Sequence, residues 1–286
     1  MIPGPFSYHR PATLAEAVNL LSTLGDEAET FRWLQGDNVN GIIDGLKGKE
    51  HDLHRVESLF PTRFAESWSK FKKDVPDLAP GAAVYLLPAP RRAVGGSVRP
   101  LSHRSAVIFG AEEILSVIDS QTAFNVLTQH ELTHLYHMQV NPEMRQMIAQ
   151  VYMPPFAEGR SKLYQVLWLE GLAVYRSKVL NPSSTDQQIL LSSTVASDVA
   201  AVWPNLGHGL RSVLDSNKAA DIGAYLFDAD TTGQIPRRAG YYVGMQIARH
   251  LSKTNSFAAL CRLQGPELRA KVSEALAYLE ANGITS

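Results

Sequence analysis

His130-Glu131-Leu132-Thr133-His134 lies inside a stretch, about residues 120–138, whose apolar residues recur at helical spacing. On an α-helix, residues four apart lie on one face, one turn from each other. Both imidazoles can therefore reach the same metal ion while Glu131 flanks it. Asn141-Pro142 ends the pattern, because proline lacks the amide proton that would continue the helix. The stretch predicts a zinc-binding helix of a hydrolase.

A second interpretation treats the two histidines as ordinary polar residues of a helix face and Glu131 as a solvated acid. The histidines share their stripe with Ala123, Val126 and Leu127, so they are expected to face the interior. Polar groups on an otherwise apolar face are costly unless they are hydrogen-bonded or ligated. A metal ion satisfies both rings at once, which favours the metal site.

Glu170 is the candidate third ligand. It is the only acidic residue of an almost entirely apolar helical stretch, residues 162–179, and it shares a face with Leu163 and Val174. An unpaired charge there would be expensive to desolvate. The alternative is a carboxylate paired with a buried arginine or histidine. Gly171 and Ala173 beside it would let another helix approach closely.

Three motifs in this order resemble a known family. His-Glu-x-x-His followed by Trp168-Leu-Glu-Gly-Leu-Ala-Val-Tyr175 resembles the gluzincin zinc metallopeptidases, in which the downstream glutamate completes the metal site. The segment Pro236-Arg-Arg-Ala-Gly-Tyr-Tyr-Val-Gly244 is similar to the Gly-Tyr-x-x-Gly element of a bacterial group of predicted Zn-dependent proteases. The resemblance covers roughly residues 83–255 and implies a zincin-like fold.

The chain also departs from that family. His134 and Glu170 lie further apart in sequence than the corresponding ligands of thermolysin-like enzymes, which predicts an inserted loop around residues 141–159. Val174 stands where those enzymes have an aspartate that supports a histidine ligand. His137 lies about 10 Å along the helix from His130, too far to share a metal easily. His137 is therefore expected in the core or behind the ligands.

The ligand set predicts a mechanism. Zn²⁺ held by His130, His134 and Glu170 would keep one open position, where it lowers the pKa of water and polarises a carbonyl. Glu131 would accept the proton of the attacking water and pass it to the leaving amine, as general base and then general acid. The expected activity is hydrolysis of peptide bonds.

The oxyanion formed during attack needs a second electrophile, for which Tyr241 is the first choice because of the resemblance. Tyr242 and His208, the latter in an expected loop over residues 203–209, remain open as alternatives. Tyr175 is expected in the core.

The fold class expected is α+β and mainly helical, with a small mixed or antiparallel sheet beside the active-site helix. Residues 82–87 and 105–109 are β-branched or aromatic runs bounded by proline and glycine, which is typical of strands. An edge strand there could pair with an extended peptide substrate. Residues 90–99 are expected to form a mobile basic loop, either near substrate or as a surface hairpin.

Two regions are predicted. Residues 1–78 would form an N-terminal helical region packed on the catalytic part, and residues 79–286 a gluzincin-like catalytic domain. Thr13-Leu-Ala-Glu16 reads as a capping box that opens a helix. Further helices are expected near residues 51–59, at 61–74 with Pro61 in the first turn, and at 266–281.

Composition fits a hydrolase of ordinary size. The chain has 286 residues, of which 45% are hydrophobic, and a formal net charge of −1. That charge provides no field for nucleic acid or an anionic membrane, so neither partner is expected. Cys261 is the single cysteine, which fits a reducing compartment, and no apolar run is long enough to span a membrane. A cytoplasmic protein is expected.

The partner expected is a peptide or protein substrate, and the oligomeric state stays open. Two alternatives to a peptidase also remain. A zinc hydrolase of a non-peptide amide or ester would use the same metal and base. A zincin-fold binding or regulatory protein would have lost turnover.

Overall fold

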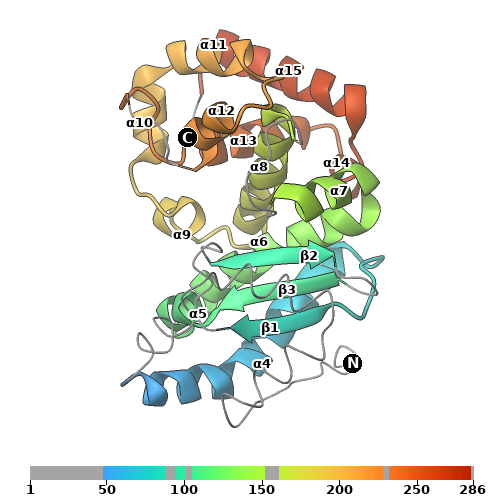
Figure 1. Ribbon diagram of the computed structural model, residues 1–286, viewed down its shortest axis with the longest axis vertical. Helices are drawn as coiled ribbons and strands as arrows, with labels where there is room; N and C mark the ends of the chain where they lie inside the picture. Colours follow the sequence, from blue (N-terminus) through green and yellow to red (C-terminus); the bar gives the residue numbers. More distant parts are fainter. Residues whose placement is uncertain (1–47, 88–94, 101–104, 152–160, 228–231, 285–286) are drawn as a thin grey trace. The chain divides into compact units, whose positions relative to one another are not determined.

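The computed structural model describes residues 48–87, 95–100, 105–151, 161–227 and 232–284 (Figure 1). The expected capping box at Thr13–Glu16 lies outside the described residues. The chain divides into two compact units, residues 1–135 and 136–286, and α6 (Gln121–Val140) passes from the first to the second. The described chain is mainly helical with one small mixed sheet, as its pattern predicts.

The first unit contains the sheet, whose strand order is β1-β3-β2. The central strand β3 (Ser105–Gly110) pairs in parallel with β1 (Ala83–Leu87) and antiparallel with β2 (Gly96–Pro100). Five of the six residues of β3 are buried, in keeping with an apolar run. The two strands predicted at 82–87 and 105–109 are thus confirmed, although β3 is the middle strand.

The prediction of a mobile loop over residues 90–99 is wrong at its C-terminal end, and residues 88–94 lie outside the described chain. Residues 96–100 form β2, in which Ser97, Val98 and Arg99 are 1–4% exposed. Polar and apolar side chains are buried alike in this strand. Its sequence therefore lacks the alternation of polar and apolar residues by which a half-buried strand is predicted.

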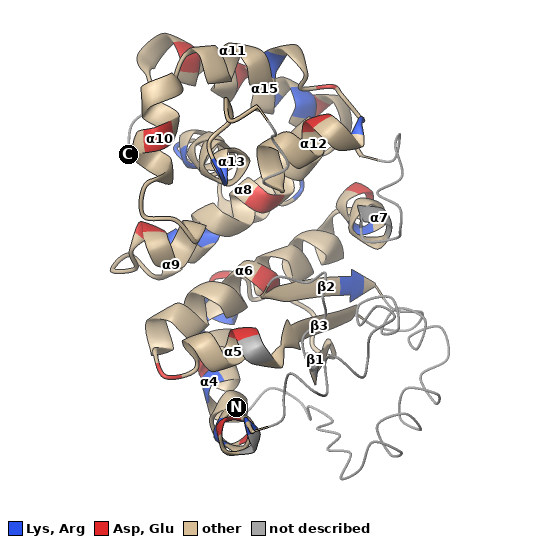
Figure 2. Cartoon of the chain, turned by 60° about the vertical axis from the view of Figure 1, so that its left-hand side comes forward, with Lys and Arg blue, Asp and Glu red and all other residues tan. Residues whose placement is uncertain are grey.

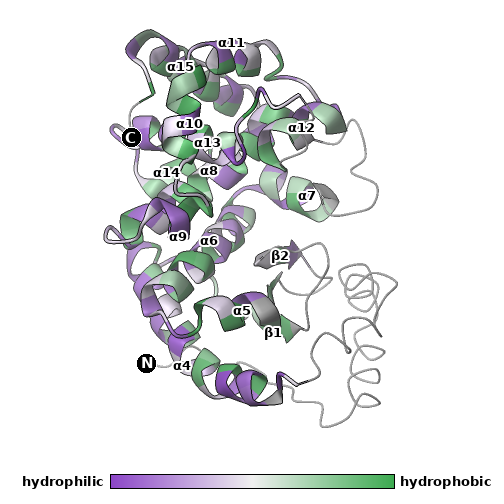
Figure 3. Cartoon of the chain, turned by 90° about the vertical axis from the view of Figure 1, so that its left-hand side faces the viewer, coloured by the Kyte–Doolittle hydropathy of each residue, from purple (hydrophilic) through white to green (hydrophobic). Residues whose placement is uncertain are grey.

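Aromatic packing joins α4 (Glu50–Asp74) to the sheet and to α6. The Phe60 ring lies edge-on to Phe109 of β3 and to Phe124 of α6, with centroids 5.7 Å apart in both pairs. Figure 3 shows hydrophobic and hydrophilic residues alternating around α4. The buried stripe continues at helical spacing through Val56, Phe60 and Phe64.

The prediction of two helices broken at Pro61 is wrong, because α4 runs through the proline without interruption. Proline removes one backbone hydrogen bond and clashes with the preceding turn, at a cost of about 3 kcal/mol. The apolar stripe on both sides of Pro61 buries several aromatic rings against the unit's core. Burial of about 2 kcal/mol per large side chain offsets that cost.

In the second unit, α8 (Leu163–Leu180) crosses α13 (Ala239–Leu251) with the two backbones in contact. A Cβ at Gly171 would lie 2.2 Å from the carbonyl carbon of Gly244, and a Cβ at Gly244 would lie 2.5 Å from the Leu167 oxygen. Glycine is thus required on both sides of the crossing. The close approach expected at Gly171 is confirmed.

Asn141 and Pro142 do end α6, but the inserted loop expected at 141–159 is wrong in its first part. Residues 142–151 form α7 (Pro142–Val151), and residues 152–160 are outside the described chain. The Asn141 side chain accepts a hydrogen bond from the Met144 amide and donates to the Cys261 and Leu263 carbonyls. The buried amide therefore starts α7 and ties it to the C-terminal segment.

The remaining helices complete the two units. In the first unit, α5 follows β3 and packs against α4, and in the second α15 packs against α8, α11 and α13. Their bounds are α5 (Ala111–Val117), α9 (Asp186–Leu190), α10 (Val195–Val202), α11 (Asn205–Ser212), α12 (Ala219–Leu226), α14 (Phe257–Leu260) and α15 (Gly265–Asn282). Helix α15 confirms the helix predicted at residues 266–281.

Over the described ranges, every helix is too short or too polar to cross a membrane.

Candidate metal centre

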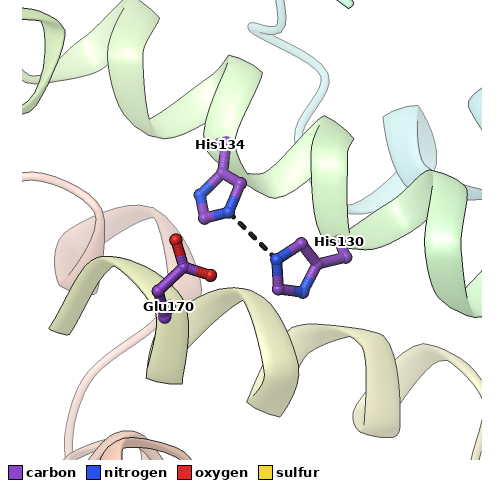
Figure 4. A group of neighbouring side chains, drawn as sticks. All are labelled: His130, His134 and Glu170. Atoms are coloured by element: carbon purple, nitrogen blue, oxygen red, sulfur yellow. Dashed lines mark hydrogen bonds between the residues drawn. The ribbon is translucent and has the colours of Figure 1, made fainter. Parts of the chain in front are cut away.

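His130, His134 and Glu170 lie together (Figure 4). One ligand atom from each of the three side chains lies within 4.8 Å of the others. His134 and Glu170 are buried, at 5% and 6% exposure, and His130 is partly exposed. Figure 4 shows the two rings projecting from α6 and the carboxylate from α8, all directed toward one another.

The two imidazoles meet through their Nε2 atoms, which are 3.0 Å apart, with the rings nearly perpendicular at 87°. Without a metal, one of these nitrogens must carry a proton, since two lone pairs would repel each other. Tetrahedral zinc with Zn–N bonds of 2.0–2.1 Å holds its nitrogen ligands about 3.3 Å apart. The histidine pair therefore fits one zinc ion with a small adjustment.

Local sequence explains why these residues can meet. The histidine pair comes from the i, i+4 spacing on α6, which is deeply buried along its second half. Glu170 is a buried acid on a helix that carries little charge, as Figure 2 shows for α8. The adjacent Gly171 is the point at which α8 touches α13. A nitrogen–nitrogen–oxygen set of this kind is a typical ligand set of catalytic zinc.

Glu131 is buried at 4% exposure and lies against the backbone of β2. A Cβ at Gly96 would be 2.5 Å from Glu131 Cγ and 2.8 Å from its Oε1 atom. The carboxylate next to the histidine pair thus occupies the space that the missing side chain at position 96 leaves free. Sequence reasoning missed Gly96, although a glycine in a short strand ahead of the motif is a known sign of close approach.

Tyr241 lies in the first turn of α13 and is 8% exposed. It precedes Gly244 by three residues, so its backbone is one turn from the contact with Gly171, the neighbour of Glu170. The guanidinium carbon of Arg238 lies 3.6 Å from the centre of the Tyr241 ring. Sequence reasoning also missed Arg238. The role of Tyr241 stays a prediction.

Tyr242 is one of the largest fully buried side chains of the described chain. Burial raises the pKa of its hydroxyl, and the nearby Gln246 side chain offsets part of this rise. The phenol is thus held in its neutral form inside the second unit. This environment is typical of a packing residue.

The other candidates lie elsewhere. His208 is exposed on α11, so the loop expected there is wrong: residues 205–212 are helical. Tyr175 is partly buried and its hydroxyl lies 2.6 Å from that of Ser252, at the end of α13. His137 is completely buried, in agreement with its expected place in the core or behind the ligands.

The GYxxG glycines have a packing role. Gly244 makes the contact with α8, and a Cβ at Gly240 would lie 2.7 Å from the Tyr225 carbonyl oxygen at the end of α12. This element of sequence therefore sets α13 between two helices and fixes the position of Tyr241 between the two glycines.

No family model matches the chain, and no curated protein or solved structure matches it either.

Proposed function

We propose that this chain is a zinc-dependent peptidase of the gluzincin type, with a zincin-like catalytic region. The observation that supports this best is the convergence of His130, His134 and Glu170 within 4.8 Å. Two imidazoles and one carboxylate leave zinc a position for water or substrate, which structural zinc sites lack. Zinc, when bound, supplies Lewis acidity toward water and toward a substrate carbonyl.

Glu131 is the general base of the proposed reaction. It neighbours the first ligand in sequence, and its buried carboxylate is confined beside Gly96. It would take a proton from the attacking water as the new C–O bond forms. The same proton then goes to the leaving amine as the C–N bond breaks, so the carboxylate returns to its starting state.

Tyr241 is the proposed electrophile for the developing oxyanion. Its phenol would donate a hydrogen bond to the carbonyl oxygen as that oxygen gains charge. Its position one turn from the α8–α13 crossing supports this role, because Glu170 is adjacent to the same crossing.

A peptide rather than a small ester is the proposed substrate because the three sequence motifs resemble those of gluzincin metallopeptidases. The metal ligands and the general base do not by themselves select the acyl group.

The test uses the purified chain with zinc, a mixed peptide library and mass spectrometry. Wild type should cleave peptides, and a chelator should abolish cleavage until zinc is restored. Glu131→Gln should bind zinc normally and lose at least about 10³-fold in kcat, because it removes the proton acceptor. Glu170→Gln should lose zinc affinity. The matched control is Glu274→Gln, since that side chain is 69% exposed on α15.

The same experiment separates the alternatives. Turnover of small esters or amides without peptide cleavage would favour the non-peptide hydrolase. Zinc binding with no turnover of any of these substrates would favour the binding or regulatory protein. Peptide cleavage that Glu131→Gln leaves unchanged would overturn the assignment of the base.

A further inference from the structure

The guanidinium of Arg238 is held against Tyr241 by a ring contact and a hydrogen bond. Its Cζ atom lies 3.6 Å from the centre of the Tyr241 ring, and its Nε–H donates a 3.1 Å hydrogen bond to the Leu190 carbonyl. The ring contact is close for a cation–π pair, for which about 6 Å is the usual limit. The hydrogen bond prevents the planar group from turning away from the ring.

The backbone is strained at the donor, Arg238, and at the residue directly after the acceptor, Leu191. Arg238 has φ 63° and ψ 12°, and Leu191, directly after the accepting residue, has φ 56° and ψ 26°. These are the two non-glycine residues with positive φ in the described ranges. The left-handed conformation is unfavourable for side chains such as leucine and arginine. Such strain persists where surrounding structure imposes it, often near functional groups.

The ring that Arg238 covers belongs to the proposed oxyanion donor. Tyr241 is buried, and its backbone lies one turn from the Gly171–Gly244 contact. The α13 backbone at this crossing is packed directly against the α8 backbone, so it cannot shift toward α8. Arg238 would then determine the remaining freedom of the tyrosine, which is the orientation of its ring.

We propose that Arg238 is a positioning residue that acts through Tyr241. This inference rests on the proposed function. The guanidinium holds the ring in one orientation and draws electron density from its face, which makes the phenol a stronger hydrogen-bond donor to the oxyanion. Arg238 itself touches no reacting atom. Leu190 serves as the fixed acceptor that holds the guanidinium in place.

The kinetic test is a double-mutant cycle of Arg238→Gly and Tyr241→Phe in the zinc-loaded protein. Glycine removes the guanidinium and suits the left-handed backbone, so the variant should fold. We expect kcat to fall about tenfold in Arg238→Gly with KM little changed, and about 100-fold in Tyr241→Phe. In the Tyr241→Phe background, Arg238→Gly should have no further effect on kcat.

Two further variants test whether the effect depends on the guanidinium of Arg238 and on its position. Arg238→Lys keeps a cation but has no Nε donor for Leu190, so it should restore part of the lost kcat. Arg237→Ala removes the same charge from the preceding, exposed residue and should leave kcat unchanged. An equal fall of kcat in both tyrosine backgrounds, or an equal fall in Arg237→Ala, would overturn the proposal.

A second readout is independent of turnover. The chain has ten tyrosines, so labelling with 3-fluorotyrosine should give ten ¹⁹F resonances, and Tyr241→Phe identifies the one that disappears. Arg238→Gly should shift and broaden this resonance more than any other, with or without zinc. If the Tyr241 resonance does not shift in Arg238→Gly, the proposed contact between Arg238 and the Tyr241 ring is wrong. If the wild type cleaves no peptide, the proposed function fails, and the resonance still decides whether Arg238 controls the ring.

Discussion

At the scale of single residues, the absence of a side chain at position 96 makes room for the proposed base. Glu131 is buried and fills that space, with its Cγ, Cδ and Oε1 atoms all nearer than 3.0 Å to a hypothetical Cβ. The Glu131 side chain is flexible at its end, whereas the β2 backbone is held by its pairing with β3. A methyl group at position 96 would therefore move the carboxylate rather than the strand.

Gly96→Ala is expected to lower kcat for peptide hydrolysis by 10²-fold or more, since a displacement of about 1 Å at a reacting group can cost that much. Zinc affinity should stay within about threefold of wild type, because none of the three ligands lies on β2. Stopped-flow or steady-state kinetics and a competition titration for zinc measure the two quantities.

The control for Gly96→Ala must not itself strain the backbone, which excludes a glycine with positive φ such as Gly81. Ala106→Gly on β3 is the matched control, since it changes one methyl group in the neighbouring strand at a position that pairs with Arg99 and not with Gly96. A wild-type kcat in Gly96→Ala would show that the carboxylate position does not matter for turnover.

At the scale of elements, the α8–α13 crossing determines where Glu170 and Tyr241 lie in the second unit. Both glycines at the crossing meet backbone atoms of the other helix. Backbone cannot rotate away as a side chain can, so the contact admits no Cβ. The same glycines would otherwise weaken their helices, each by about 1 kcal/mol relative to alanine. Their place in two buried helices is thus explained by packing.

Gly244→Ala should lower the free energy of unfolding by about 1–3 kcal/mol, because the new methyl group would lie 2.5 Å from the Leu167 oxygen and 2.8 Å from Gly171 Cα. Urea denaturation measures this change. The control is Gly209→Ala on α11, where the Tyr225 hydroxyl at 3.2 Å is the nearest obstacle. Equal stability of the two variants would contradict the close crossing.

At the scale of the whole molecule, folding and metal binding are expected to be linked. The three ligands come from two helices separated by α7 in sequence, and an unfolded chain does not hold them together. Zinc would therefore bind the folded chain in strong preference to the unfolded one. Any ligand with that preference stabilises the fold by mass action.

At free zinc 100-fold above its dissociation constant, the gain in stability should be about 2.7 kcal/mol. Scanning calorimetry of the metal-free and zinc-loaded chain would show this as a higher Tm, by about 2–4 °C per kcal/mol for a chain of this size class. Glu170→Gln should show a much smaller gain at the same zinc concentration. An undiminished gain in a His130→Ala/His134→Ala double variant would place the zinc elsewhere.

The sequence by itself determined the features that depend on local spacing. The histidine pair on α6 follows from the 3.6-residue helical turn, which places residues four apart on one face, and Glu170 is conspicuous as a lone acid on an apolar helix. The strands β1 and β3 follow from short apolar runs bounded by turn residues. Each of these signals lies within a window of a few residues, which is the range over which periodicity is informative.

Only the tertiary structure decided the rest. The strand β2, the unbroken α4 and the helix around His208 all run against local signals, and packing or pairing with distant residues stabilises them. The contacts of Gly96 with Glu131 and of Arg238 with Tyr241 and Leu190 likewise became visible only in three dimensions. The physical reason is that close packing and long-range hydrogen bonds depend on which segments meet, and local periodicity does not encode that.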